Sequence, residues 1–362
     1  MKTFMGVGKG STASAIDAAI SGLVSPSMIL FITSYESAAE TAAKIYERFP
    51  NIPSIGTIGT KIANGMVGDQ EIAVLGLYED AKVSCGVIRN LSSCPVTSVK
   101  ELEKKIQEVS PGKDNTVCIE FCTGFEERLV TTFHAALEAK GIQLAGGTVF
   151  GIPEGNEAVV AYNGKLYEDS CVYAIIKNTV GKVKVFKENI YKKSSQISHV
   201  ATKVDVNSKA LLELDGKPAA TVYSQELDIP KEKIIDNVLK NPMGRVVGDQ
   251  VFISSMRNLR SNGALENFKR INKNDCIYFL ELGDYRKIED EMRDMIRKEM
   301  KGISLVLSVD CIYRYLLYEQ ENYFTTYAKN MASLGTHIGV VSGGEQFNNQ
   351  HVNQTMVCAV FE

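Results

Sequence analysis

The chain has 362 residues, of which 44% are hydrophobic and 23% are charged, as in an ordinary globular protein with roughly two domains. Its formal net charge of -3 argues against nucleic acid as a partner, because phosphate binding needs clustered Lys and Arg. The N-terminus carries no apolar secretory segment, and the run Met28–Ile32 is far too short to span a membrane. A cytoplasmic protein is therefore predicted.

Eight cysteines lie mostly within apolar runs that read as strands, and none forms a CxxC pair. This pattern predicts reduced, buried thiols in a cytoplasmic protein. Cys118 and Cys122 would share one face of a strand with Glu120, but His134 lies too far along the chain for a standard zinc spacing. No metal site is predicted.

The first predicted elements are a strand at Thr3–Val7 and a helix at Ala13–Ser21 capped by Ser11. Gly6, Gly8 and Gly10 precede this helix, as glycines do in phosphate-binding loops. Their spacing matches neither of the usual phosphate motifs, and Lys9 precedes the last glycine instead of following it. We interpret the run as a tight turn and a helix cap.

Two segments of the N-terminal half share one order of elements. Residues 29–59 and 118–151 each read as a buried strand, a helix and a short strand ending in glycines. Identical residues recur 90 positions apart: Phe31 and Phe121, Thr33 and Thr123, Gly56 and Gly146, Gly65 and Gly155. We therefore predict an internal repeat, with residues 28–77 and 118–166 as equivalent units with right-handed crossovers and mainly parallel central strands.

The middle of the chain has a different residue pattern, with a polar segment followed by short alternating strands. Glu188–Val200 is polar and is predicted to be the boundary segment between the two halves of the chain. Lys209–Leu227 has an Asp-Gly turn between apolar strands, followed by a helix. Asp249–Leu282 alternates like antiparallel strands, and Lys287–Lys301 is an amphipathic helix.

A third, looser strand–helix–strand unit ends the chain, with predicted strands at Ile303–Val309 and Thr336–Val341. The predicted fold is thus α/β with two modules, 1–205 and 206–362. The N-terminal module holds the repeat, and the C-terminal module holds a mixed sheet.

Several short motifs, in this order, resemble the FIST family of prokaryotic sensory proteins, with its N-terminal and C-terminal modules. They are FPNIPSIGTIGTKIANG at 49–65, LELDGKPAATVYSQEL at 212–227, SVDCIYR at 308–314, GGEQF at 343–347 and HVNQT at 351–355. The resemblance implies a sensor of small ligands, with amino acids as proposed ligands, coupled to a kinase, cyclase or chemoreceptor. Since the two modules fill this chain, we expect the output partner to be a separate protein.

The polar stretch Ser342–Thr355 precedes a last apolar strand, where open α/β folds place ligands. Arg314 and Glu345 are suited to bind the carboxylate and the ammonium of a zwitterion. Asn353 and Thr355 would add hydrogen bonds, and Cys311 and His351 complete the predicted ligand site. On this hypothesis Arg314→Ala weakens ligand binding and barely changes the stability of the free protein. The alternative is that Arg314 and Glu345 pair with each other, or simply cap the helix and the loop.

Two other functions remain open. Cys311 stands at a strand-to-helix turn, so a thiol-dependent enzyme using His337 or His351 is one alternative. A haem-binding nitric oxide sensor, known among FIST relatives, is the other, and it would require an axial ligand such as His351. An exposed loop is the more common setting for such a histidine. We predict a sensor that is not an enzyme and needs no cofactor.

Overall fold

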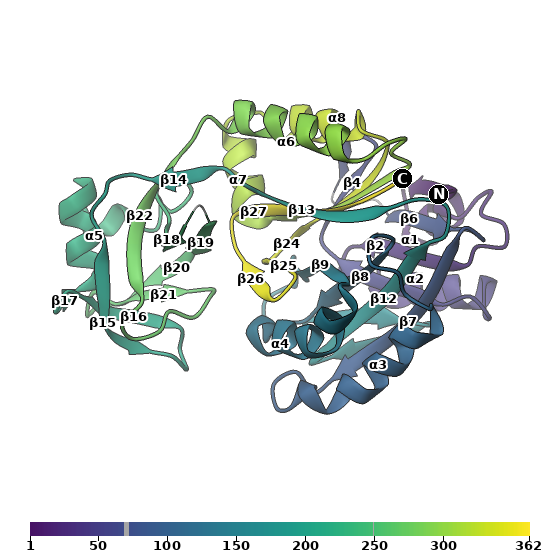
Figure 1. Ribbon diagram of the computed structural model, residues 1–362, viewed down its shortest axis with the longest axis horizontal. Helices are drawn as coiled ribbons and strands as arrows, with labels where there is room; N and C mark the ends of the chain where they lie inside the picture. The colour runs from purple at the N-terminus through teal and green to yellow at the C-terminus, as the bar shows by residue number, and fades with distance from the viewer. Residues whose placement is uncertain (69–71, 249) are drawn as a thin grey trace. The chain divides into compact units, whose positions relative to one another are not determined.

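The computed structural model describes residues 1–68, 72–248 and 250–362, and the ribbon forms two compact units (Figure 1). Unit one consists of Met1–Lys187, Met292–His351 and Met356–Glu362, and unit two of Glu188–Glu291 and Val352–Thr355. Unit one thus takes segments from both ends of the chain. No single boundary in the sequence therefore separates the two compact units. The module boundary predicted at 205/206 stays a prediction.

The first sheet of unit one carries the first helices. Its order is β1 (Thr3–Gly8), β6 (Ile72–Leu77), β2 (Met28–Thr33), β3 (Ser54–Ile58), β10 (Val159–Tyr162) and β11 (Lys165–Glu168). Helices α1 (Thr12–Ala19) and α2 (Ala38–Arg48) share a core with it. Every residue of β2 is buried, as its sequence MILFIT requires.

Two glycines within β1 allow α1 to pack directly on that strand. A Cβ on Gly8 would lie 1.7 Å from the carbonyl oxygen of Ala15, and one on Gly6 would lie 1.9 Å from that of Ala19. Gly10, with φ of +100°, makes the turn into the helix. The predicted turn is confirmed only at Gly10, because Gly6 and Gly8 belong to β1 itself. Ser11 is the N-cap residue, but its side chain makes no capping hydrogen bond.

The second sheet of unit one packs against helices α3 (Val99–Glu108) and α4 (Glu126–Leu137) (Figure 1). Its order is β26 (Gln350–Val352), β25 (Glu345–Phe347), β9 (Gln143–Thr148), β8 (Thr116–Cys122), β12 (Ser170–Asn178) and β7 (Ala81–Arg89). Short 3-10 helices, Pro95–Ser98 and Glu138–Lys140, flank α3 and α4. Leu102, Leu129 and Phe133 of the two helices pack on Tyr173 of β12.

The predicted repeat corresponds only partly to the topology. The pairs β2–β3 and β8–β9 are each parallel and joined through a helix. However, Phe31 pairs with Gly56 whereas Phe121 pairs with Gly147, so the registers differ by one residue. The expectation of mainly parallel strands is wrong, because β6, β10, β7 and β12 all pair antiparallel with their neighbours.

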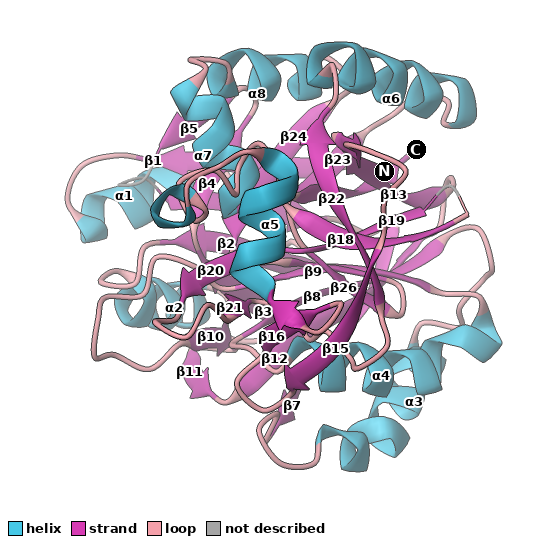
Figure 2. Cartoon of the chain, turned by 90° about the vertical axis from the view of Figure 1, so that its left-hand side faces the viewer, coloured by secondary structure: helices cyan, strands magenta, loops and turns pink. Residues whose placement is uncertain are grey.

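The third sheet of unit one contains the predicted third strand–helix–strand unit. Its order is β13 (Val183–Asn189), β27 (Thr355–Phe361), β23 (Leu305–Cys311), β24 (Thr336–Ser342), β4 (Thr60–Ala63) and β5 (Met66–Gly68). The pair β23–β24 is parallel. The connecting helix is divided into α7 (Ile312–Gln320) and α8 (Phe324–Ala332), both near β24 (Figure 2). Asn322 lies between them with φ of +51°, which a continuous helix does not allow.

Unit two is an antiparallel sheet with α5 (Ala219–Leu227). Its order is β19 (Gln250–Ser254), β18 (Met243–Val247), β22 (Cys276–Leu282), β15 (His199–Asp205), β16 (Ala210–Leu214), β21 (Leu265–Asn267) and β20 (Met256–Leu259), with β14 (Tyr191–Lys193) on β22 and β17 (Lys217–Pro218) on β16. A 3-10 helix, Lys231–Lys233, follows α5.

Several predictions for the middle of the chain are confirmed. Asp215 and Gly216 have φ of 51° and 75°, so the Asp-Gly pair forms a two-residue hairpin turn. The amphipathic helix is α6 (Tyr285–Glu299). The predicted alternating strands are β19 to β22, although Asp249, where that prediction begins, lies outside the described residues.

Candidate functional site

All six residues predicted to bind a ligand are buried. Their exposed fractions are 3% or less: Cys311, Arg314, Glu345, His351, Asn353 and Thr355. The first four belong to unit one, and Asn353 and Thr355 belong to unit two. The expectation that His351 lies in an exposed loop is wrong, because it lies in β26 with 2% of its surface exposed. That the six form one ligand site stays a prediction.

Arg314 is enclosed by protein groups in the first turn of α7. Its guanidinium lies 4.9 Å and 5.0 Å from the ring centroids of Tyr318 and Tyr327. Its Nε is 3.6 Å from Oδ1 of Asp310, which also accepts a 2.6 Å hydrogen bond from the hydroxyl of Tyr327. Both members of this ion pair are fully buried, so removing either one would leave an uncompensated buried charge.

The histidines that a thiol enzyme would use each hydrogen-bond with a side chain of the fold. His337 in β24 has its Nε2 2.9 Å from the hydroxyl of Ser308. Burial lowers the pKa of His337 to about 4, so its imidazole is neutral at physiological pH. Nδ1 of His351 lies 3.3 Å from the amide nitrogen of Gln346. Cys311 is a buried residue at the start of α7.

The polar residues of β25 point in two directions. Gln346 also donates to the hydroxyl of Thr148 at 3.2 Å, and Thr148 donates to the carboxylate of Glu126 at 3.1 Å. Glu345 lies on the opposite face of the strand, where Ser342 donates to it at 3.5 Å. The amide nitrogen of Gln346 and the imidazole of His351 therefore bond within the fold.

A pocket of 640 Å³ that the sequence analysis missed lies at the carboxyl ends of β2 and β3. It is lined by residues from four segments: Gly10–Thr12, Ser34–Ser37, Ile58–Thr60, and Phe150 with Gly151. Parallel strands of open α/β sheets place ligands at this end. Small or polar residues, Ser34 and Gly59, follow the two strands, and this is the sequence signal that could have indicated the pocket.

Two helices begin at this pocket. The N-cap residues Ser11 and Ser37 make no side-chain capping bond, and the hydroxyl of Ser37 lies 3.1 Å from that of Thr12. The first N–H groups of a helix lack intrahelical partners and carry partial positive charge, so they attract a carboxylate. Glu36 adds one negative charge and Phe150, 37% exposed, adds an apolar wall.

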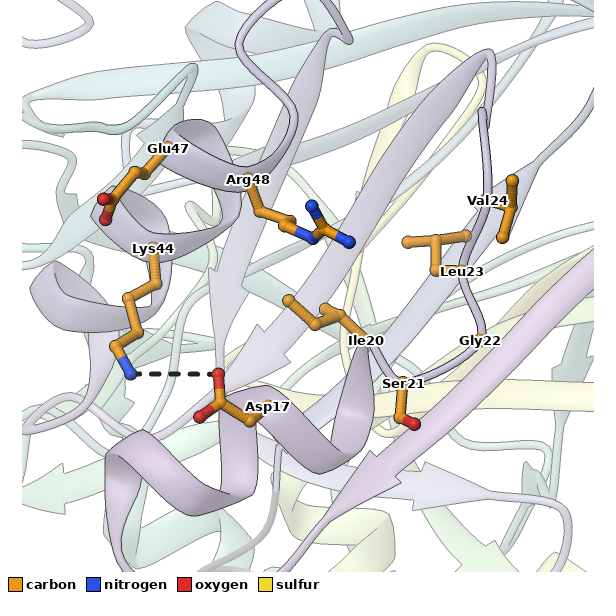
Figure 3. A pocket seen from close by; sticks show the side chains of 9 residues that line it. All are labelled: Asp17, Ile20, Ser21, Gly22, Leu23, Val24, Lys44, Glu47 and Arg48. Atoms are coloured by element: carbon orange, nitrogen blue, oxygen red, sulfur yellow. Dashed lines mark ion pairs between the residues drawn. The ribbon is translucent and has the colours of Figure 1, made fainter.

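A second pocket, of 670 Å³, lies at the other ends of the same helices (Figure 3). Lys44 there is 3.9 Å from Asp17, and Arg48 extends toward Ile20. Helix C-termini carry partial negative charge, which Lys44 and Arg48 offset. The second pocket therefore has little net positive potential with which to attract an anion. We take the 640 Å³ pocket at the ends of β2 and β3 as the candidate site.

The fold and the pocket define a two-unit α/β protein with a cavity suited to a small molecule. A family model described as the FIST N domain matches residues 27–217, and one described as the FIST C domain matches residues 219–348. The chain belongs to the FIST family, as its motifs indicated. No curated protein matches it. Among the described residues, no helix is long and apolar enough to cross a membrane.

Proposed function

We propose that this protein senses a small polar ligand, which binds in the pocket beyond β2 and β3. The observation that supports this is the convergence of two strand ends and two helix starts on one cavity of 640 Å³. FIST domains are associated with sensing in signal transduction, and most of the pocket lies within the FIST N match.

The ligand is an amino acid or a similar metabolite. Its carboxylate would face the N–H groups at the start of α1 and α2, and its ammonium would face Glu36. Phe150 and Ile58 would contact its apolar part. The volume falls within the range of about 300–1,000 Å³ that is usual for small-molecule sites.

The signal would pass to a separate output protein of the kinase, cyclase or chemoreceptor type. A cytoplasmic location is part of this proposal, because free and mostly buried thiols such as Cys118, Cys122 and Cys358 are typical of a reducing compartment. Two further parts of the hypothesis, that no cofactor is needed and that Cys311 catalyses no reaction, stay predictions.

A thermal-shift and calorimetric screen of amino acids tests the proposal. A ligand at one hundred times its dissociation constant is expected to stabilise the protein by about 2.7 kcal/mol. Glu36→Gln is expected to weaken binding by about ten- to one-hundredfold, because a hydrogen bond to a charged group contributes about 1.5–3 kcal/mol.

The matched control is Arg48→Gln in the second pocket, which leaves affinity unchanged. If Glu36→Gln binds as well as the unchanged protein while an Arg314 variant that remains folded does not bind, the ligand occupies the site predicted from the C-terminal motifs instead.

A further inference from the structure

A row of side chains crosses the second sheet of unit one beneath α4. Gln346 pairs with Gly146, Gly146 with Glu120, and Glu120 with Tyr173. Paired residues of neighbouring strands point to the same face of a sheet. A Cβ on Gly146 would lie 2.3 Å from Oε1 of Glu120, so this glycine leaves the space that the carboxyl group of Glu120 occupies.

The carboxyl group of Glu120 has an apolar and acidic environment. The side chain is fully buried, and among the described residues its Oε1 has no hydrogen-bond partner. Its Oε2 accepts a 3.1 Å hydrogen bond from the thiol of Cys171. The titratable groups that face it are thiols of β8 and β12, a phenol of β12 and a carboxylate of α4: Cys118, Cys122, Cys171, Tyr173 and Glu126. In the part of the chain that the structure describes, Glu120 forms no ion pair.

We propose that Glu120 is a proton-dependent switch, neutral while α4 packs on its sheet and loosening that packing when it ionises. An ionised carboxylate here would be desolvated, would lie near the carboxylate of Glu126, and would leave one oxygen without a donor. The protein relieves this cost either by keeping the proton or by admitting water beneath α4.

The pKa of Glu120 agrees with this geometry. Burial, with a further contribution from the charge of Glu126, raises the pKa to about 8 from an ordinary value of 4.5. Between these two values the folded protein holds a proton that the unfolded chain has lost. Stability therefore falls as pH rises from about 4.5 to about 8, by up to tenfold in the folding equilibrium constant per pH unit, and the loss is complete above the folded pKa.

The test is a series of equilibrium unfolding measurements between pH 5 and 9 on the full chain and on Glu120→Gln. Relative to the variant, the unchanged protein is expected to lose up to about tenfold in its folding equilibrium constant per pH unit up to about pH 8, and to level off above it. Above pH 8, amide exchange in α4, corrected for its intrinsic rate, should be faster in the unchanged protein than in the variant. Glu138→Gln, at a side chain that is 71% exposed, is the control and should follow the unchanged protein. Parallel pH profiles for the unchanged protein and Glu120→Gln would overturn the proposal.

A second measurement needs no folded variant. The infrared spectrum of the unchanged protein at pH 7 is expected to contain the carbonyl band of a protonated carboxyl group, which disappears above pH 9. Its absence at pH 7 would mean that Glu120 is ionised in the packed state, and the switch would be rejected.

Discussion

Replacing Arg314 by methionine is expected to lower the free energy of unfolding by about 3–5 kcal/mol, the usual cost of removing one partner of a buried ion pair. Methionine keeps much of the volume but removes the charge that faces Asp310 at 3.6 Å. It also removes the cation that lies over the rings of Tyr318 and Tyr327. Urea denaturation followed by circular dichroism measures the loss.

Arg297 provides the matched control, because its side chain is 48% exposed and its partner Asp294 lies 3.2 Å away at the surface. Arg297→Met is expected to cost less than about 1 kcal/mol. The double variant Arg314→Met with Asp310→Asn should recover part of the loss, since no buried carboxylate then lacks its cation.

This outcome differs from the expectation drawn from the sequence, in which Arg314→Ala leaves stability nearly unchanged and weakens ligand binding. If Arg314→Met proves as stable as the unchanged protein, the ion pair with Asp310 is not structural. The ligand-binding hypothesis for Arg314 would then regain its support.

Local patterns predicted the helices and strands well. The alternation and length of apolar runs placed β23, β24 and α6 within two residues of their observed bounds. Turn chemistry placed the hairpin at Asp215 and Gly216. These features depend on residues that are close in the sequence, which a single chain displays directly.

Strand direction and burial depend on residues far apart in the sequence, and the predictions that were wrong concern these two properties. Nothing local to β12 shows that it returns antiparallel between β8 and β7. An exposed loop was the expected setting of His351, but it is buried and lies within hydrogen-bond distance of the buried Gln346. The candidate pocket brings together four separate segments, and each alone reads as an ordinary turn.

The second large effect is expected at His199, which joins three elements of unit two. Its Nδ1 lies 2.6 Å from Oδ2 of Asp215 in the hairpin turn, and its Nε2 lies 2.6 Å from Oε2 of Glu226 in α5. The ring also packs on Phe279, with centroids 5.1 Å apart. A protonated ring can donate to both carboxylates at once. His199→Gln, which cannot donate to both, is expected to cost about 2–4 kcal/mol at pH 6, where two charge-assisted hydrogen bonds are lost or weakened.

The raised pKa of His199 determines whether its stabilisation grows or falls as pH rises. Burial alone would lower the pKa of His199, but the hydrogen bonds to Asp215 and Glu226 outweigh it and hold the pKa above 6.5. The stabilisation is therefore fully present below pH 6.5 and is lost as pH rises through the raised pKa. Burial would raise the pKa of Asp215, but its hydrogen bonds from His199 and Val200 outweigh burial and lower the pKa. The stability that ionised Asp215 adds to the folded state is therefore lost as pH falls below 3.8.

Amide exchange in α5, corrected for its intrinsic rate, measures this contribution because Glu226 attaches that helix to the ring of His199. In the unchanged protein, protection of α5 should decline as pH rises through the raised pKa of His199. In His199→Gln, protection should be low already at pH 6 and should stay level. The control is His134→Gln, at a side chain that is 37% exposed and 3.1 Å from Glu138, where a change below about 1 kcal/mol is expected. Equal protection of α5 in the unchanged protein and in His199→Gln at pH 6 would contradict the prediction. The hydrogen bonds of His199 to Asp215 and Glu226 would then not stabilise α5.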